Sequence, residues 1–485
     1  MDSLPVDVFQ EILDHIAHPV TLHTQWPIAD SELRVACSLL ATCRLWRDVI
    51  LATPRMWSCI QVTGDIDERH VEYVRNSLKR SGDTPLDICL YEAADFGGDD
   101  VHLAECFALV SAHRSRIRRL HYWTSTISLD DLQEFTRPLP LLEELVLVPP
   151  RGRHDDLIWP SWQTDDPRYF QGYSRLRRLE SHVAFMVPAH PLPTLSYLSL
   201  SLRGDVEGYD PIWQSLAQTP ALEELRLYFA ESRWRSVDSG DCQNLSLPHL
   251  VRLAVFGAPN HYQWAEKLNA PKLTTLTISI EWCDINSRLY RALRDRVRHL
   301  IIMTVETRSG GFLNDSDTIA LDELESLSTF ELRDIREEML SSSNQGFFQH
   351  LVDRIVESSD GSPWSARVPA LILRRCRFSW RACESLIRFV GVRHGASAEH
   401  GRPMLGLKLV DTTFVKYGSY KPAGFEDIEH YFANAQFERV QVTVDQSPEP
   451  VDGWGEWSDA DDDGGVIGWQ IFDRSNSPSG AVEEV

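Results

Sequence analysis

Apolar residues recur along most of the chain at one spacing: an aliphatic residue, two variable positions, a second aliphatic, one variable position and a third aliphatic. Clear copies begin at Ile117, Leu142, Leu195, Leu222, Leu250 and Leu273, and weaker ones at Leu176, Val297, Leu327, Val368, Met404 and Phe437. Successive copies begin 19 to 41 residues apart. Such self-similarity predicts a repeat architecture, in which neighbouring units cover each other's apolar surfaces.

Each copy predicts a short strand, because successive side chains of a strand point to opposite faces. The last two aliphatics would then enter the core, and the variable positions between them would lie on the concave face of a solenoid. Helical returns are predicted at residues 210–219, 261–268, 285–297, 347–356, 380–390 and 425–433. The predicted fold class is α/β, an irregular solenoid over residues 63–444 with parallel strands on the concave side and helices on the convex side. An ordinary parallel α/β sheet is the alternative, which suits twelve short strands less well.

In residues 1–62 the apolar residues follow a different spacing, which predicts a short helical domain. Val8, Ile12 and Leu13 recur at helical spacing, and Pro5 suits a first helical turn because its missing N–H is not needed there. Two further apolar segments follow, at residues 33–43 and 46–50. A unit this small buries little apolar surface alone, so we expect it to pack on a partner or on the next domain.

Charge separates the C-terminus from the rest. The chain has 48 basic and 71 acidic residues, a net charge of −23. Residues 445–485 hold eleven acidic residues and one Arg among Gly, Pro and Ser, which predicts a disordered acidic tail. The overall negative charge disfavours non-specific binding to nucleic acid or to a membrane surface.

Motifs for catalysis or metal binding are missing. The sequence has no Gly-rich phosphate loop followed by Lys, no H-E-x-x-H and no G-x-S-x-G. Nine Cys without a C-x-x-C pair indicate reduced thiols and a cytoplasmic or nuclear location. No apolar run reaches the 18 residues of a membrane span. We expect no catalytic residue, metal or cofactor, and a hydrolase hidden in the repeats is a disfavoured alternative.

The N-terminal segment resembles an F-box of the type common in basidiomycete fungi. The resemblance covers about 60 residues. It rests on Leu4-Pro5, Asp7, the stripe Val8-Ile12-Leu13, the core Cys43-Arg44-Leu45-Trp46-Arg47, and Thr53-Pro54-Arg55-Met56-Trp57 leading into Ile60. A long insert from His18 to Leu33 departs from the family pattern.

The repeats are similar to the leucine-rich repeats of many F-box proteins. Together the two resemblances imply a substrate-recognition adaptor of an SCF-type, cullin-RING ubiquitin ligase, in which the F-box docks on a Skp-type linker and the repeats bind a protein target. Carried over by position, the docking residues would be Leu4, Pro5, Val8, Ile12, Leu13, Cys43 and Trp46. A protein-interaction scaffold not linked to ubiquitin transfer is the alternative.

The variable positions of the early repeats are charged and aromatic, and Arg and aromatic side chains often dominate binding energy. The predicted target-binding residues are Arg119, Trp123, Arg178, Arg226 and Tyr228. For each of them, a merely solvated position is the alternative.

Overall fold

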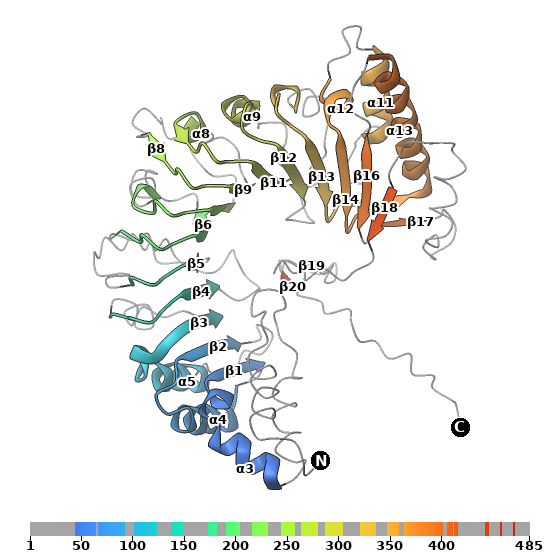
Figure 1. The fold of residues 1–485 in the computed structure, drawn as a ribbon. Coiled ribbons are helices and arrows are strands. Elements are labelled where there is room, and N and C mark those ends of the chain that lie inside the picture. Colours follow the sequence, from blue (N-terminus) through green and yellow to red (C-terminus); the bar gives the residue numbers. More distant parts are fainter. Residues whose placement is uncertain are drawn as a thin grey trace, which may run out of the picture. The chain divides into compact units, whose positions relative to one another are not determined.

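The structure is a computed structural model of the 485-residue chain. It describes residues 44–64, 66–92, 101–123, 137–148, 173–181, 191–203, 216–230, 244–257, 263–279, 287–303, 321–335, 347–357, 363–400, 405–410, 412–415, 442–445, 456–457 and 469–470. The chain divides into two compact units (Figure 1). Unit 1 comprises residues 1–190 and 448–485, and unit 2 comprises residues 191–447.

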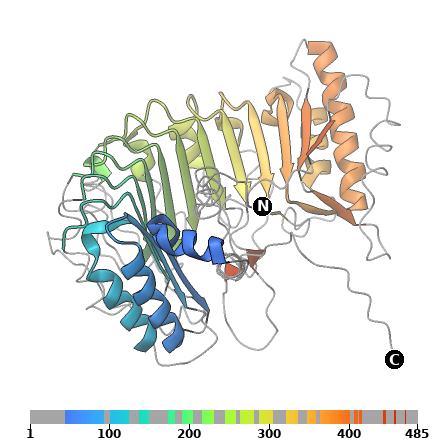
Figure 2. The ribbon, with the colours of Figure 1, turned by 60° about the horizontal axis from the view of Figure 1, so that its bottom comes forward.

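Unit 1 carries a parallel sheet whose strands follow one another in chain order. They are β1 (Cys59–Gly64), β2 (Leu86–Glu92), β3 (Ile117–Trp123), β4 (Glu144–Val148) and β5 (Arg178–Ser181). Helices α4 (Glu68–Arg80) and α5 (Val101–Ser111) connect the first three strands and lie side by side on one face of the sheet (Figure 2). The short helix η2 (Arg114–Arg116) leads into β3.

Two features of the sequence explain helix α4: a polar cap at its N-terminus and a stripe of buried, mostly apolar residues along one side. The carboxylate of Asp67 accepts hydrogen bonds from the backbone N–H groups of Arg69 and His70, and the His70 ring accepts one from the backbone of Asp67. This capping box satisfies donors that the first helical turn leaves open. The buried residues follow the helical period: Val71, Val74, Ser77 and Leu78.

Unit 2 carries a second run of parallel strands with one register throughout. They are β6 (Tyr197–Arg203), β7 (Glu224–Ala230), β9 (Arg252–Gly257), β11 (Thr275–Ser279), β12 (His299–Met303), β13 (Thr329–Arg333), β14 (Ala370–Arg374), β16 (Gly406–Val410) and β18 (Val442–Asp445). Two small parallel pairs also form: β8 (Leu245–Ser246) with β10 (Leu268–Asn269), and β15 (Arg377–Ser379) with β17 (Thr413–Val415).

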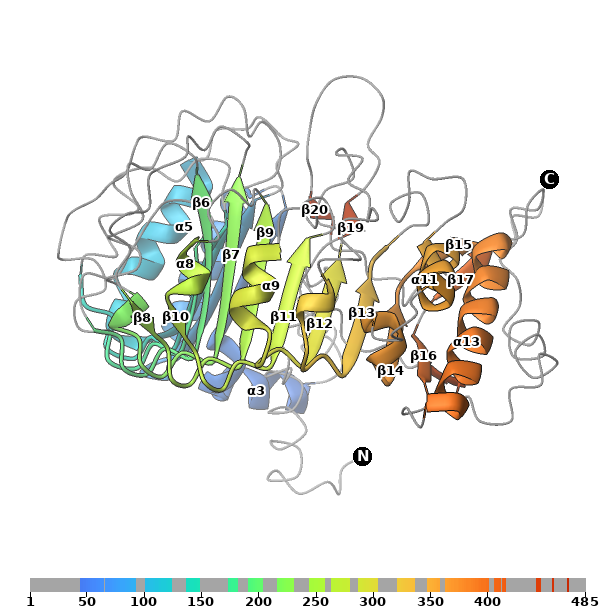
Figure 3. The same ribbon diagram turned by 90° about the horizontal axis from the view of Figure 1, so that it is seen from above.

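The helices of unit 2 lie on one face of its sheet (Figure 3). They are α8 (Gln263–Glu266), α9 (Ser287–Leu293), η4 (Leu321–Glu323), α11 (Phe347–Glu357), α12 (Trp364–Arg367) and α13 (Trp380–His400). Helix α11 packs along α13. The aliphatic residues of the strands point toward these helices and form the core, as Leu225, Leu227, Leu253 and Val255 do.

The α/β class, with parallel strands and helical returns, is confirmed. Helices are confirmed at the predicted positions 261–268, 285–297, 347–356 and 380–390, and the last runs on to His400. The structure describes only the end of the return predicted at 210–219, and the one at 425–433 lies outside the described residues. Of the predicted tail it describes Asp445 and the short antiparallel strands β19 (Glu456–Trp457) and β20 (Trp469–Gln470).

The last predicted repeat copy was wrong in register. The sequence suggested Phe437, Val440 and Val442, but β18 pairs Val442 with Leu407 and Val444 with Leu409. The second and third aliphatics are therefore two residues later than predicted. Strand side chains alternate with period two, so a shift of two residues leaves the same face apolar and the pattern cannot exclude it.

The parallel strands begin earlier than the first predicted copy. Strands β1 and β2 precede Ile117, and β1 crosses the predicted boundary at residue 62. Ile60 and Val62 are buried, but the first position of their repeat is Trp57. The pattern of three aliphatic residues therefore does not predict β1.

Candidate functional site

The side chains at the variable positions lie on the face of each sheet opposite the helices, here called the inner face. Because the strands pair in register, these side chains form rows across neighbouring strands. In unit 1, one row runs Cys59, Asp87, Arg119, Glu144, Arg178, and the next runs Gln61, Cys89, His121, Val146, Glu180. The first row alternates in charge from Asp87 onward.

Glu144 is the centre of the charged cluster in unit 1. Its side chain is only 5% exposed, and three cationic or ionisable groups surround its carboxylate. Arg178 Nε lies 3.2 Å from one carboxylate oxygen and His121 Nε2 lies 3.3 Å from the same atom, while Arg119 Nε lies 3.7 Å from the other. Arg178 also donates a 2.9 Å hydrogen bond to Glu180. The carboxylate therefore lies within ion-pair distance of two arginines, one on β3 and one on β5.

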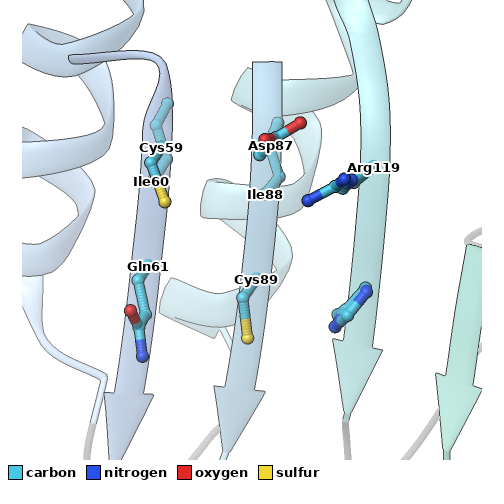
Figure 4. A pocket seen from close by; sticks show the side chains of 8 residues that line it. Cys59, Ile60, Gln61, Asp87, Ile88, Cys89 and Arg119 are labelled. Carbon is cyan, nitrogen blue, oxygen red and sulfur yellow. The ribbon is translucent and has the colours of Figure 1, made fainter. Parts of the chain in front are cut away.

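A shallow hollow lies beside this cluster, over the first three strands (Figure 4). It encloses about 250 Å³, including the part open to solvent. Its lining residues are Cys59, Ile60, Gln61, Asp87, Ile88, Cys89, Arg119 and His121. Asp87 is buried and accepts hydrogen bonds from Arg118, which raise the pKa of that guanidinium.

The Cys89 thiol in the hollow is not activated. Burial, and to a lesser extent the neighbouring Cys59, raise the pKa of Cys89 well above its ordinary value. The thiol is therefore protonated at neutral pH, whereas a nucleophilic cysteine needs a lowered pKa. This arrangement favours binding over covalent chemistry at Cys89.

Glu224 organises a second cluster, on β7 and β9 of unit 2. It accepts hydrogen bonds from Arg226 and Arg252, each at 2.6 Å. Burial alone would raise the pKa of Glu224, but the two guanidinium charges outweigh burial and lower it. The Arg226 guanidinium also lies 5.2 Å from the centre of the Tyr197 ring, within range of a cation–π contact.

An aromatic pair lies next to this cluster. Tyr228 stacks on Phe256 with ring centres 4.6 Å apart and ring planes at 20°. Tyr228 is only 7% exposed and Phe256 is also buried. Tyr228 therefore stabilises the sheet surface and offers little area to a partner.

Glu331 organises a third cluster, on β12, β13 and β14. One carboxylate oxygen accepts hydrogen bonds from Arg333 at 2.9 Å and Arg374 at 3.1 Å, and the other lies 3.1 Å from His299 Nε2. Burial alone would raise the pKa of Glu331, but the hydrogen bond with His299 and the arginine charges lower it to about 2. Glu331 is therefore charged at neutral pH although its side chain is only 2% exposed.

The three clusters share one arrangement: a buried glutamate beneath two arginines that are more exposed than it is. The side chains of Arg333 and Arg374 are 17% and 15% exposed, whereas that of Glu331 is 2% exposed. In the second cluster the side chain of Arg252 is 60% exposed and that of Glu224 is 11% exposed. In the Glu224 and Glu331 clusters, charge-assisted hydrogen bonds fix long side chains that would otherwise be mobile. The inner face therefore presents ordered cations to solvent and keeps its carboxylates underneath.

The structure separates the five predicted target-binding residues. Arg119 and Arg178 meet at Glu144 in unit 1, whereas Arg226 and Tyr228 lie on β7 of unit 2. Trp123 is the last residue of β3, and its side chain is outside the described part.

Of the predicted docking residues, Leu4, Pro5, Val8, Ile12, Leu13 and Cys43 lie outside the described residues. Trp46 lies in α3 (Arg44–Ala52), which leads through the short helix η1 (Pro54–Trp57) into β1. Ile50 and Trp57 form a small buried cluster there, with Trp46, Val49 and Met56 packed against it and partly exposed.

Trp57 stabilises this N-terminal cluster and connects it to helix α4 of the same unit. Its indole N–H donates a 3.0 Å hydrogen bond to the carbonyl of Ile50, and the guanidinium of Arg80 from α4 lies 4.3 Å from its ring centre. The helix that bears Trp46 is thus held against the start of the sheet.

The third cluster was missed by sequence reasoning. Glu331, Arg333 and Arg374 occur in the weaker repeat copies that begin at Leu327 and Val368, beyond the early repeats whose charged and aromatic positions predicted the binding face. Their signal is simple: each Arg directly follows the last aliphatic of its copy, and the pairing of β13 with β14 brings the two together.

No family model matches the chain, and no curated protein matches it either. Within the described part of the chain, no three His, Cys, Asp or Glu side chains are arranged to hold a metal ion. Across that same part, none of the helices combines the length and the apolar character needed to cross a bilayer.

Proposed function

We propose that the chain is a substrate-recognition adaptor of an SCF-type, cullin-RING ubiquitin ligase. Residues 1–62 would act as the F-box that docks on the Skp-type linker, and the leucine-rich repeats of residues 63–444 would hold a protein target. The observation that carries the proposal is the inner face, where buried glutamates fix arginine side chains in position for a partner. Pre-ordered Arg side chains suit protein recognition because less entropy is lost on binding.

The N-terminal helix supports the docking part of the proposal. In α3 and η1, Trp46, Val49 and Met56 are only partly buried, and Leu51 is exposed. A small helical segment with this much accessible apolar surface is suited to packing on a second protein. The F-box resemblance of residues 1–60 supplies the identity of that protein, the Skp-type linker.

The mechanism follows from proximity. An adaptor that binds the ligase at one end and the target along its sheet raises the effective concentration of target lysines near the ubiquitin-charged enzyme. Transfer then behaves like an intramolecular reaction, and the adaptor needs no reactive group of its own. The protonated thiol of Cys89 agrees with this role.

Affinity capture with mass spectrometry tests the proposal and identifies the target. We expect the intact chain to capture a Skp-type linker, a cullin and a target. The double variant Leu4→Ala/Pro5→Ala should lose the linker and the cullin at least about tenfold but retain the target, because hot-spot residues carry most of an interface's energy. Point variants are needed because deletion of residues 1–62 would cut β1.

The matched control is Val101→Ala/Val356→Ala, which removes apolar groups from two exposed positions outside the F-box-like segment. It should capture all three proteins as the intact chain does. If the intact chain captures a target but no Skp-type linker, the chain is an interaction scaffold and the ligase proposal fails.

A further inference from the structure

The inner face of unit 2 carries a positive band within a negative protein. From β9 to β16, its basic residues are Arg252, His299, Arg333, Arg374 and Lys408, here called the cationic band. On the inner face of β12 to β16, the permanent cations are Arg333, Arg374 and Lys408, and the one carboxylate is that of Glu331. With His299 neutral, the net charge of this surface is therefore +2. The next acidic position in register is Asp445, two strands beyond Arg374.

The centre of the band is rigid. Arg333 and Arg374 occupy paired register positions on β13 and β14, and both donate to the same oxygen of Glu331. The pKa of Glu331, lowered to about 2, keeps that anchor charged at any physiological pH. Two guanidinium groups are thus held side by side on neighbouring strands, an arrangement that suits carboxylate recognition.

The surface between the cations is largely uncharged. Several of the neighbouring inner-face positions carry short, partly accessible residues: Thr275, Thr277, Thr329, Ala370 and Gly406. Others carry larger apolar residues: Ile301, Met303 and Ile372. From Arg252 on β9 to Lys408 on β16 is five strand steps, or about 24 Å at about 4.8 Å per step. An extended peptide rises about 3.3 Å per residue, so about seven residues would span the band.

We propose that the cationic band binds an extended acidic segment of a protein partner, with Asp or Glu carboxylates on Arg252, Arg333, Arg374 and Lys408. This rests on the proposed function and names the chemistry of the substrate that the adaptor selects. A nucleic acid is disfavoured because the protein's net charge of −23 repels a long polyanion, whereas a short acidic segment meets only the local positive potential.

The test is fluorescence anisotropy of a labelled peptide of about nine alternating Asp and Glu residues, titrated with the full-length chain. Its counterpart with Asn and Gln is the uncharged reference. We expect the acidic peptide alone to bind, and its binding to be lost at about 0.5 M salt, because exposed charge pairs are screened. The variant Arg333→Gln/Arg374→Gln should weaken binding at least about tenfold.

Two further variants make the result specific. Arg377→Gln/Arg381→Gln removes the same charge from exposed positions on β15 and α13, and should bind within about twofold of the intact chain. Arg252→Gln/Lys408→Gln leaves the Glu331 cluster intact and should weaken binding about fivefold even if the first variant does not fold. Equal binding of both peptides, or equal loss in the band variants and the control, would overturn the proposal.

The chain's own acidic tail is the competing occupant. If the peptide binds only after residues 446–485 are removed, the tail fills the band and the proposal of a partner segment fails. Capture of the Skp-type linker is measured with the same proteins. Linker capture without peptide binding refutes the acidic segment alone, whereas peptide binding without linker capture refutes only the adaptor proposal.

Discussion

Buried glutamates are the residues that give the inner face its character. Glu144, Glu224 and Glu331 each sit beneath arginines from neighbouring strands. A buried carboxylate with only one partner would be costly, but each of these glutamates has several cationic or ionisable partners, which offset the loss of hydration. The contacts that stabilise the glutamates also order the arginines, so the stability of the fold and the proposed recognition of a partner depend on one set of residues.

Glu331 makes stability depend on pH in a defined direction. Its folded-state pKa of about 2 lies below the ordinary 4.5, so its stabilising contribution is complete above pH 4.5 and is lost as pH falls toward 2. The difference corresponds to roughly 3 kcal/mol at neutral pH. We expect Glu331→Gln to lower the free energy of unfolding by about that amount at pH 7.

Urea unfolding between pH 7 and pH 3 measures this effect. The gap between the intact chain and Glu331→Gln should shrink by about half from pH 5 to pH 3. Glu105→Gln is the control, because Glu105 pairs with Arg75 on the surface and such pairs contribute little. A gap that is constant across this range would show that Glu331 does not titrate as inferred.

Helix α11 is anchored by buried aromatic side chains, among them Phe348. Phe348 is fully buried, with its ring centre 5.4 Å from that of Phe347 and 5.7 Å from that of Phe378 on β15. Both contacts are edge-to-face, a favourable aromatic geometry. Phe348 thus joins the helix to the layer of strands that precedes α13.

Phe348→Ala should lower the free energy of unfolding by about 3 to 5 kcal/mol, the cost of a large cavity in a packed core. Thermal and urea unfolding measure the change. Val356→Ala on the same helix is the control, because Val356 is 69% exposed and its loss should change little. A loss below about 1 kcal/mol for Phe348→Ala would mean that α11 is not packed as described.

The sequence predicted the positions of helices and strands better than it predicted the contacts between side chains. Period-two aliphatics identified the strands of the large sheet from β3 to β16, because burial on the helix side requires them, as at Leu225 and Leu227. The pattern missed β2 and the short strands of the small sheets, and it missed β1, where Trp57 replaces an aliphatic residue. It placed β18 two residues too early, an error that leaves the apolar face unchanged.

The candidate site was less predictable for a physical reason. The contacts of an inner-face side chain are made largely with residues on neighbouring strands. A single repeat copy does not contain those residues, so its sequence does not reveal the contacts. Arg226 and Tyr228 look alike in the sequence as outward positions, yet Arg226 pairs with Glu224 whereas Tyr228 is buried against Phe256. The pairing of Glu331 with Arg374 joins residues 43 positions apart, so only the strand register reveals it.

The whole molecule combines a negative chain with ordered positive sites on its sheets. The net charge of −23 disfavours non-specific polyanion binding. Local cations on the inner face can still select an acidic partner, because screening in physiological salt limits the field of the distant acidic residues to about 8 Å. This division suits an adaptor that must reject most partners and hold one.

The most direct test of the adaptor proposal is calorimetric titration of the purified full-length chain with a purified Skp-type linker. We expect one-to-one binding with a dissociation constant below about 1 μM, corresponding to more than about 8 kcal/mol. Leu4→Ala/Pro5→Ala should abolish it, and Arg333→Gln/Arg374→Gln should leave it unchanged. No measurable binding by the intact chain, or equal binding by the Leu4/Pro5 variant, would contradict the account.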